Sequence, residues 1–352
     1  MAIKVVVSGT GKMGQEVLRT VCREPDLEPV GVVEKFSAEE FLSLPDGSGL
    51  VPFGNDPASL LARSRPDVVV DFTNAEWTPI LARSCLDAGV RLVSGTTGLP
   101  EAFVEELGRE CRERGLGAVV AANFAIGAVL MIHLAKLAAR HFDYGEIIEL
   151  HHEKKADAPS GTALATARAM LAGRGQPFQY PTTAKETLPG TRGGALEGIS
   201  IHSVRLPGLV AHQEVILGTL GQTLTIRHDT TSRESFMPGV LLATREVMNR
   251  QELVVGLDRL IGLDPARTGH AKGSAGPAVA HAVEHHASLL QGRDHLVVQV
   301  QGLLVGEGVI GELGVVRALV PLVVKVATGD KLQEHCVHAF LGAPVHHRQR
   351  ML

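Results

Sequence analysis

The sequence has few aromatic residues, no excess of basic charge and no long apolar run, and each absence excludes a class of protein. Aromatic residues make up 4% of the chain, too few to indicate a surface on which nucleic-acid bases stack. The net charge of −4 provides no broad basic surface for nucleic acid or anionic lipid. No segment reaches the roughly 18 consecutive apolar residues of a transmembrane helix. We therefore predict that the chain binds neither nucleic acid nor membrane.

Cysteine is also scarce. The four cysteines are Cys22, Cys85, Cys111 and Cys336, and no two of them have the C-x-x-C spacing of a metal or redox site. The N-terminus, "MAIKVVVSG", passes directly into a strand pattern without the features of a signal peptide. Both observations favour a cytoplasmic protein with reduced thiols.

The first part of the chain alternates between strand and helix patterns. Residues 3–7, "IKVVV", form a β-branched run of strand length, followed by the glycine turn "SGTGKMG" and a segment with helical spacing. Further buried strands are predicted at 66–73 and near 91 and 118, with helices between them. This βαβα order predicts an α/β fold with a parallel sheet covered by helices on both faces.

The glycine turn predicts a dinucleotide site. Gly9, Gly11 and Gly14 permit backbone N–H groups to approach a pyrophosphate at the start of a helix. Glu34, at the end of the next strand, is placed to accept hydrogen bonds from a ribose, and Lys35 is placed to attract a 2′-phosphate. The cofactor is therefore NADH or NADPH. An ordinary tight βα turn is the alternative. The loops 95–98 and 121–127 follow two further strands and extend the same crevice.

After residue 126 the pattern changes. A helix is followed by an alternating strand, a helix beginning at Ser160, and period-2 segments separated by glycine and proline, which predict an antiparallel or mixed sheet. A helix returns at 236–249. The segment 265–352 contains nine of the sixteen histidines; it is rich in valine, glycine and leucine but has one phenylalanine and neither tryptophan nor tyrosine. His281 and His285 are spaced as a metal pair, but the segment shows no third ligand, so we predict no metal.

The segment 146–163, "EIIELHHEKKADAPSGTA", concentrates groups that bind anions and transfer protons. His151 and Lys155 are candidates to supply a proton near neutral pH. Ser160 is a good N-cap, and the N–H groups of Gly161 and Thr162 are then available to a carboxylate at the helix start. His152 and Lys155 can add charge-assisted hydrogen bonds. The alternative is a solvated loop followed by a helix cap.

This segment matches, position by position, the signature E-[IV]-x-E-x-H-x3-K-x-D-x-P-S-G-T-A of the dihydrodipicolinate reductases. "SGTGKMG", "VDFT", "SGTTG", "AANFAIG", "HSVRLPG" and "TSRESF" also resemble that family, over about residues 3–264. The resemblance implies reduction of 4-hydroxy-tetrahydrodipicolinate (dihydrodipicolinate), a small cyclic dicarboxylate, to tetrahydrodipicolinate with NADH or NADPH in the diaminopimelate route to lysine. Another Rossmann dehydrogenase and a non-catalytic dinucleotide sensor remain alternatives.

The family's organisation implies three parts for this chain. Residues 1–125 and 235–264 form a Rossmann-type dinucleotide-binding domain, and 126–234 form an inserted α+β domain that binds substrate and builds a homotetramer. Residues 265–352 have no counterpart, and we predict that this extension is poorly packed. Two further departures are a glycine turn one residue shorter than the family's pattern and Ala125 where serine is common.

The resemblance also assigns residues to roles. His151 and Lys155 resemble the catalytic acid/base and proton donor, and His152, Ser160, Gly161 and Thr162 the substrate contacts. The residues that resemble cofactor contacts are Gly9, Thr10, Gly11, Lys12, Met13, Glu34, Lys35, Gly95, Thr96, Thr97, Ala121, Ala122, Asn123, Phe124, Arg233 and Phe236.

Overall fold

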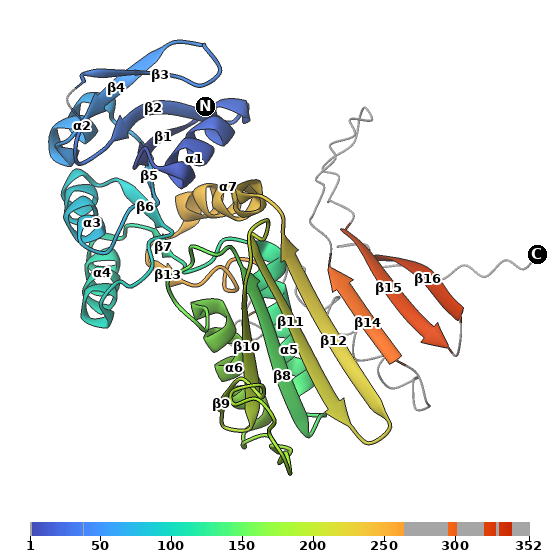
Figure 1. The fold of residues 1–352 in the computed structure, drawn as a ribbon. Coiled ribbons are helices and arrows are strands. Elements are labelled where there is room, and N and C mark those ends of the chain that lie inside the picture. Colours follow the sequence, from blue (N-terminus) through green and yellow to red (C-terminus); the bar gives the residue numbers. More distant parts are fainter. Residues whose placement is uncertain (1, 38, 264–294, 301–319, 329–330, 340–352) are drawn as a thin grey trace, which may run out of the picture. The chain divides into compact units, whose positions relative to one another are not determined.

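The computed structural model describes residues 2–37, 39–263, 295–300, 320–328 and 331–339. The chain divides into two compact units (Figure 1). Unit 1 comprises Met1–Val129 and Ser232–Leu263, and unit 2 contains Leu130–Thr231 together with the described strands beyond residue 264. The boundaries expected after residues 125 and 234 lie a few residues from these divisions.

Unit 1 is built on one sheet with the order β13-β7-β6-β5-β1-β2-β4-β3. Its neighbouring strands pair in parallel, except that β3 pairs antiparallel with β4. The strands are β1 (Ile3–Ser8), β2 (Leu27–Val33), β3 (Phe41–Ser43), β4 (Leu50–Gly54), β5 (Val68–Asp71), β6 (Arg91–Ser94), β7 (Ala118–Val120) and β13 (Leu253–Val255). The predicted α/β fold with a parallel Rossmann-type sheet is therefore confirmed.

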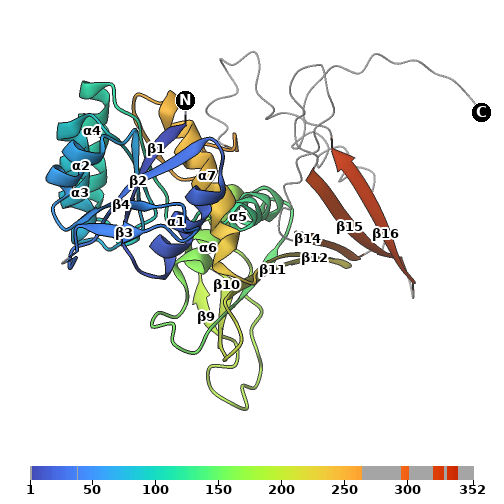
Figure 2. The same cartoon turned by 90° about the horizontal axis from the view of Figure 1, so that it is seen from above.

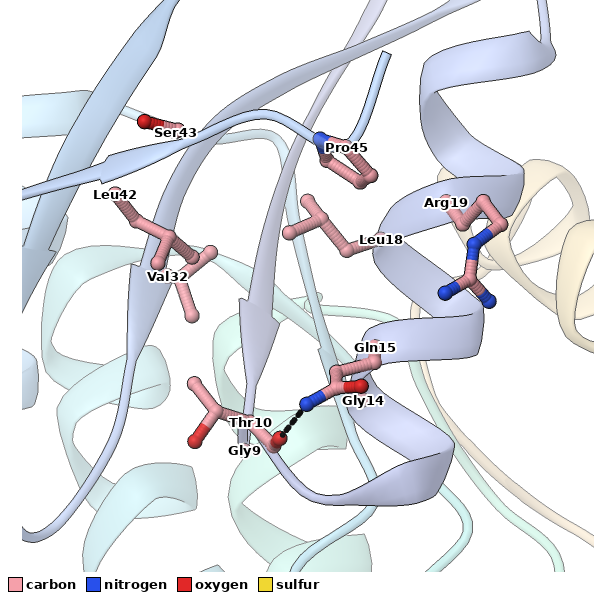
Figure 3. Close-up of a pocket in the computed structure, with 10 residues that line it drawn as sticks. All are labelled: Gly9, Thr10, Gly14, Gln15, Leu18, Arg19, Val32, Leu42, Ser43 and Pro45. Atoms are coloured by element: carbon pink, nitrogen blue, oxygen red, sulfur yellow. Dashed lines mark hydrogen bonds between the residues drawn. The ribbon is translucent and has the colours of Figure 1, made fainter. Parts of the chain in front are cut away.

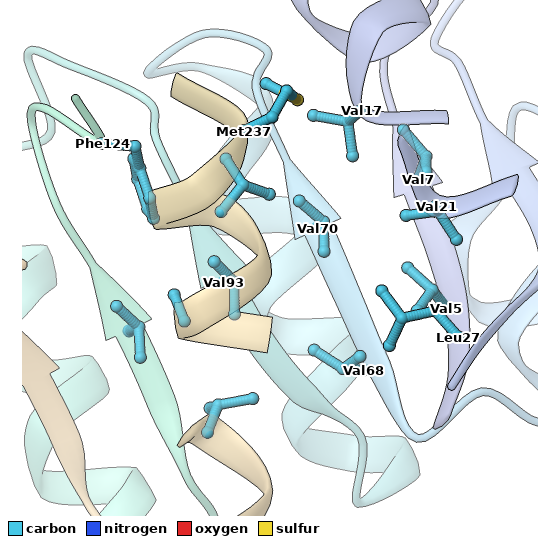
Figure 4. Close-up of a cluster of buried hydrophobic side chains, with 14 of the residues drawn as sticks. Val5, Val7, Val17, Val21, Leu27, Val68, Val70, Val93, Phe124 and Met237 are labelled. Atoms are coloured by element: carbon cyan, nitrogen blue, oxygen red, sulfur yellow. The ribbon is translucent and has the colours of Figure 1, made fainter. Parts of the chain in front are cut away.

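Helices cover both faces of this sheet because its strands carry apolar residues at odd and even positions. Val5 and Val7 of β1 pack on one face with α1 and α7 (Figure 4), whereas Val6 packs on the other face with α2, α3 and α4. The helical elements of unit 1 are α1 (Lys12–Arg23), α2 (Pro57–Ser64), α3 (Trp77–Ala88), α4 (Glu101–Arg114), η1 (Arg233–Phe236), α7 (Met237–Glu246) and η2 (Val247–Asn249). The helix α7 follows unit 2 in the sequence but packs in the core of unit 1 that contains Val5 and Val7.

The strand order places one group of loops at one edge of the sheet. From β1 the chain adds β2 and β4 in one direction and β5, β6 and β7 in the other. Parallel strands end at the same edge, and ligands of open α/β sheets bind there, next to the point where the order reverses. The loops after β1, β2, β5, β6 and β7 all lie at this edge.

Unit 2 contains a mixed sheet in which β10 is parallel to β8, and β11 is antiparallel to both β8 and β12. The helices α5 and α6 pack against one face of it (Figure 2), where Ile147, Val215 and Ile226 are buried. The elements are α5 (Ile126–Ala139), which begins within unit 1, β8 (Tyr144–His151), α6 (Gly161–Arg174), β9 (Gly194–Leu196), β10 (Ile199–Arg205), β11 (Ala211–Thr219) and β12 (Gln222–Thr230). The expected antiparallel or mixed sheet is present.

Three strands are described beyond residue 264. They are β14 (His295–Val300), β15 (Val320–Thr328) and β16 (Lys331–Ala339), and β14 pairs in parallel with β12. The expectation that 265–352 is poorly packed stays a prediction. Among the helices that the structure describes, none has both the length and the apolar character of a membrane span.

Candidate active site

The glycine turn after β1 is shaped by close backbone approach. Gly9 has a φ of 100°, and its N–H donates to the Val33 carbonyl at 2.8 Å. A Cβ on Gly14 would lie 1.9 Å from the Gly9 carbonyl oxygen, so only glycine fits there. A Cβ on Gly11 would meet no atom within 4 Å, so the turn is open at the first residue before α1. The one-residue shorter turn therefore keeps an accessible helix start.

Glu34 is held against this turn. Its Oε2 accepts hydrogen bonds from the Thr10 backbone N–H at 2.8 Å and from the Thr10 hydroxyl at 2.9 Å. Lys35 is exposed, and its ammonium lies 5.4 Å from the centre of the Phe36 ring. The structure thus brings the predicted ribose acceptor to the turn that is predicted to hold phosphate.

A cavity of about 250 Å³ borders the same turn (Figure 3). Within it, the Gln15 side-chain amide donates to the Thr10 carbonyl at 3.0 Å. The cavity is lined by Gly9, Thr10, Gly14, Gln15, Leu18, Arg19, Val32, Leu42, Ser43 and Pro45. The β3–β4 hairpin was not predicted from the sequence. Leu42 and Ser43 of β3, and Pro45 of the turn that follows it, line one side of the cavity.

A buried carboxylate organises two more loops at this edge. Asp71, at the end of β5, is fully buried and accepts hydrogen bonds from the hydroxyls of Thr73 at 2.6 Å, Thr78 at 2.7 Å, Ser94 at 2.9 Å and Thr96 at 3.1 Å. These side chains come from the loop after β5, from α3, and from β6 and the loop after it. Sequence reasoning missed Asp71 as a site residue, although a carboxylate ending a buried strand in "VDFT" was a usable signal.

The loop after β7 is tied back on itself. Asn123 Oδ1 accepts from the Ala125 N–H at 2.9 Å, and the Phe124 ring is buried with its centroid 5.3 Å from that of Phe72. Ala122 is exposed, whereas Phe124 belongs to the core of unit 1. Arg233 is exposed in η1. Of this predicted group, Phe124 therefore has a packing role in the core of unit 1.

The loops of unit 1 fit a dinucleotide. No side chain caps the start of α1 at Gly11, so the first N–H groups of that described helix receive no capping acceptor. A helix start of this kind favours a phosphate, and the open space at Gly11 admits one. Gly95 and Thr97 adjoin Thr96 at the same edge. These residues would hold NADH or NADPH, whose nicotinamide supplies a hydride when bound.

In unit 2, the histidine and the helix start of the 146–163 segment meet at one buried carboxylate. Glu149 is fully buried; its Oε2 lies 2.5 Å from His151 Nδ1, and its Oε1 accepts from the Ser160 N–H at 3.2 Å. Arg205 donates to both oxygens, at 2.9 Å to Oε2 and 2.7 Å to Oε1. The predicted groups His151 and Ser160 are therefore joined through a side chain that was not predicted.

These contacts set the protonation of the pair. Burial raises the pKa of Glu149, but hydrogen bonds from Arg205, Ser203 and His151 outweigh it, so the pKa of Glu149 lies below its ordinary value. Burial lowers the pKa of His151; Glu149 opposes this effect, and the charges of Lys155 and Arg205 add to it. The net result is a His151 pKa below its ordinary value. At neutral pH the pair is a carboxylate facing a neutral imidazole.

Lys155 lies in the turn that connects β8 to α6. Its Nζ is 2.7 Å from Asp157 Oδ1, and its backbone N–H donates to the His152 carbonyl at 3.2 Å. The hydrogen bond from Lys155 is the main reason that the pKa of Asp157 lies below its ordinary value. Glu153 and Lys154 are exposed, in keeping with a solvated position.

The start of α6 shows how the cap and the anion site are combined. The buried Ser160 hydroxyl accepts from the Ala163 N–H at 3.2 Å, so it acts as the N-cap. Its own N–H is directed to Glu149. The N–H groups of Gly161 and Thr162 lie in the first turn of α6, which has no intrahelical acceptors for them. Gly161 is exposed, which gives a carboxylate access to this turn.

No role was predicted for Glu149 from the sequence. A glutamate on the face that a helix buries was the available signal. Arg205 belongs to the motif "HSVRLPG", but its contact with Glu149 could not be predicted, because it depends on the register in which β10 pairs with β8. Within the described residues there is no cluster of metal-ligating side chains, and His281 and His285 lie outside them.

Comparison with known proteins identifies the class and then the family. Residues 3–124 match the family model "Dihydrodipicolinate reductase, N-terminus", and residues 127–261 match "Dihydrodipicolinate reductase, C-terminus". A solved amine dehydrogenase from Mycobacterium smegmatis, 18% identical with a TM-score of 0.54, covers 74% of this chain and 96% of its own and shares the fold alone. Together with the dinucleotide edge, the two family-model matches define the class as an NAD(P)H-dependent oxidoreductase.

Two 4-hydroxy-tetrahydrodipicolinate reductases, from strains of Dehalococcoides mccartyi, are 50% and 52% identical to this chain over 262 residues, covering 74% of it and 99% of theirs. The dipicolinate-bound dihydrodipicolinate reductase from Paenisporosarcina sp. TG-14 is 43% identical with a TM-score of 0.67, over 74% of this chain and 99% of its own. The chain belongs to the dihydrodipicolinate reductase family, as its sequence predicted.

Proposed function

We propose that this chain reduces 4-hydroxy-tetrahydrodipicolinate to tetrahydrodipicolinate with NADH or NADPH, as a step of lysine biosynthesis through diaminopimelate. One observation supports it most: Glu149 is hydrogen-bonded both to His151 and to the Ser160 N–H at the start of α6. Arg205, which holds Glu149, also donates to the Asp157 carbonyl in the turn that carries Lys155. A carboxylate-binding helix start beside proton-transfer groups is what a small cyclic dicarboxylate requires.

In the proposed mechanism, the N–H groups of Gly161 and Thr162 bind a substrate carboxylate, and His152 and Lys155 contribute charge-assisted hydrogen bonds to it. Loss of the 4-hydroxyl group as water would give the conjugated dihydrodipicolinate ring. A conjugated ring carbon would then accept a hydride from bound NADH or NADPH, which becomes NAD⁺ or NADP⁺, and the negative charge that develops on the substrate is quenched by one proton. Lys155 donates this proton. The neutral His151 orients the substrate or relays a proton after the transfer, because its lowered pKa leaves it unprotonated at neutral pH.

Cofactor contacts are proposed at the carboxyl edge of the unit 1 sheet. The turn from Gly9 to Met13 binds the pyrophosphate, Glu34 binds the ribose, and the loops 95–97 and 121–124 with Arg233 adjoin the nicotinamide half. Glu34 favours NADH, because its carboxylate repels a 2′-phosphate, whereas the exposed Lys35 attracts one. Both cofactors are therefore expected to serve.

We also propose a cytoplasmic homotetramer that assembles through unit 2. Among the described residues, α5 and α6 cover only one face of its sheet. The other face carries partly buried Ile148 and Ile216 beside the ion pair of Glu214 with Arg227 at 2.9 Å. Light scattering tests this assembly: a mass near four chains of 37.3 kDa supports it, and a monomer contradicts it.

The reaction is tested by coupling the purified protein to dihydrodipicolinate synthase and following the loss of NADH or NADPH absorbance. Oxidation that depends on both the synthase product and this chain supports the proposal. Cofactor binding without oxidation favours the non-catalytic dinucleotide sensor. Oxidation with unrelated semialdehydes or amino acids, and none with the synthase product, favours another Rossmann dehydrogenase.

A further inference from the structure

Glu149 is a charged side chain at a position where a strand contributes to a helix-covered core. It is fully buried, and its carboxylate accepts hydrogen bonds from Arg205, Ser160, His151 and Ser203. A buried carboxylate is costly unless it is paired and hydrogen-bonded. Arg205 supplies that pairing through two hydrogen bonds, so the charge of Glu149 is compensated without His151.

The sheet register explains why the three side chains meet. Residues 149 and 151 point to the same face of β8, since successive side chains alternate. In the parallel pair of β8 and β10, Glu149 is opposite Ser203 and His151 is opposite Arg205. Arg205 also donates to the Asp157 carbonyl at 2.7 Å, in the turn that carries Lys155. The cluster therefore fixes both ends of this turn relative to β8.

The position of Glu149 determines which nitrogen of His151 carries the proton. A carboxylate oxygen 2.5 Å from Nδ1 requires a hydrogen on that nitrogen. In a neutral ring Nε2 then carries the lone pair. The charged groups that act on this ring are Glu149 from β8, Arg205 from β10 and Lys155 from the turn; β11 places the uncharged Ala211 opposite it.

We propose that Glu149, held by Arg205, is a positioning residue that fixes the Nδ1–H tautomer of His151 and holds this ring in register with the anion-binding start of α6. It touches neither substrate nor cofactor and acts through His151 and the Ser160 N–H. Its effect on turnover rests on the proposed function, whereas its effect on the tautomer does not.

The test is Glu149→Gln, which keeps the shape and removes the charge. The ¹⁵N shifts of the His151 ring, assigned with a His151→Gln sample, report the tautomer directly. We expect the Nδ1–H form of the wild type to give way to a mixture containing Nε2–H. Turnover should fall about 10–100-fold, the scale seen when a group that orients a functional histidine is removed. The acid limb of the kcat profile should move to lower pH, because Glu149 raises the His151 pKa.

Glu146 provides a matched control on the same strand. It also pairs with one arginine and one histidine, with its Oε1 2.7 Å from Arg192 and its Oε2 3.0 Å from His202 Nε2. Glu146→Gln removes a comparable ion pair on the opposite face of β8. We expect it to leave the His151 ¹⁵N shifts and the pH profile of kcat unchanged. An equal change in both variants overturns the inference.

The outcomes separate this inference from the proposed reaction. If the wild type lacks reductase activity but Glu149→Gln shifts the His151 tautomer, the reaction is wrong and the positioning role holds. If the wild type is active and Glu149→Gln changes neither tautomer nor pH profile, the positioning role is wrong. If Glu149→Gln does not fold, Arg205→Lys is the second variant. It keeps the positive charge but loses one of the two hydrogen bonds that hold Glu149. An unchanged His151 tautomer in that variant contradicts the proposal.

Discussion

Replacing Lys155 with alanine tests the proposed proton donor most directly. The side chain of Lys155 is 22% exposed, and its ion pair is made with Asp157, whose side chain is 55% exposed. A pair this exposed contributes at most about 1 kcal/mol to stability, so the variant should fold. Loss of a general acid lowers turnover by about 10²–10⁴-fold, which is about 3–5 kcal/mol of transition-state stabilisation.

The measurement combines steady-state kinetics in the synthase-coupled assay with a fluorescence titration of NADH. We expect kcat to fall at least about 100-fold while the dissociation constant of NADH changes less than about threefold. Lys154→Ala is the matched control, because Lys154 is adjacent and exposed. Wild-type turnover in Lys155→Ala, or a loss confined to NADH binding, refutes the assigned role.

Three further predictions concern the frame of the site. Gly14→Ala should destabilise unit 1 by about 1–3 kcal/mol and raise the KM for NADH, because the added Cβ would lie 1.9 Å from the Gly9 carbonyl oxygen. Gly11→Ala is the control: its Cβ would meet no atom within 4 Å, so thermal melts should show no such loss of stability. The pKa of Asp26 is lowered, chiefly by its hydrogen bond from Arg245, so this contribution to stability is present above the unfolded-state pKa and is lost as pH falls through the folded-state pKa. Melting curves from pH 7 to pH 3 should therefore show an Arg245→Ala deficit of about 1 kcal/mol or less at pH 7 that shrinks in acid, and a deficit independent of pH would be inconsistent with this account. A chain ending at residue 266 should keep full activity, because the curated relatives and the family models match this chain without the segment beyond it; loss of folding on truncation would show that the segment is required.

The architecture of unit 1 was predictable because its signals are local. A β-branched run, a glycine turn and a helical period occur within Ile3–Arg23, and a parallel sheet then follows from the repeated βαβ order. Loops at the ends of parallel strands share one edge by geometry. For this reason the sequence could predict that Gly9, Glu34 and Thr96 share one edge, and the strand order places the loops that carry them there.

The centre of the 146–163 segment was predictable only in part. Histidines, lysine and the N-cap can be recognised along the chain, so the sequence alone proposes His151, Lys155 and Ser160 as site residues. The link among them depends on Arg205, which is 56 residues from Glu149 and reaches it only through strand register. The lowered pKa of His151 could not be predicted from the sequence, because it is set chiefly by burial.

The hydroxyl shell around Asp71 has a consequence for how this sequence can change. The hydroxyls of Thr78 and Thr96 both donate to Oδ2 of Asp71, and their oxygens lie 2.9 Å apart. The orientation of each hydroxyl therefore depends on that of the other. Side chains in one hydrogen-bond network do not contribute additively. Substitutions at Thr73, Thr78 and Thr96 should therefore be tolerated in particular combinations rather than singly, and the two loops that they connect should diverge together.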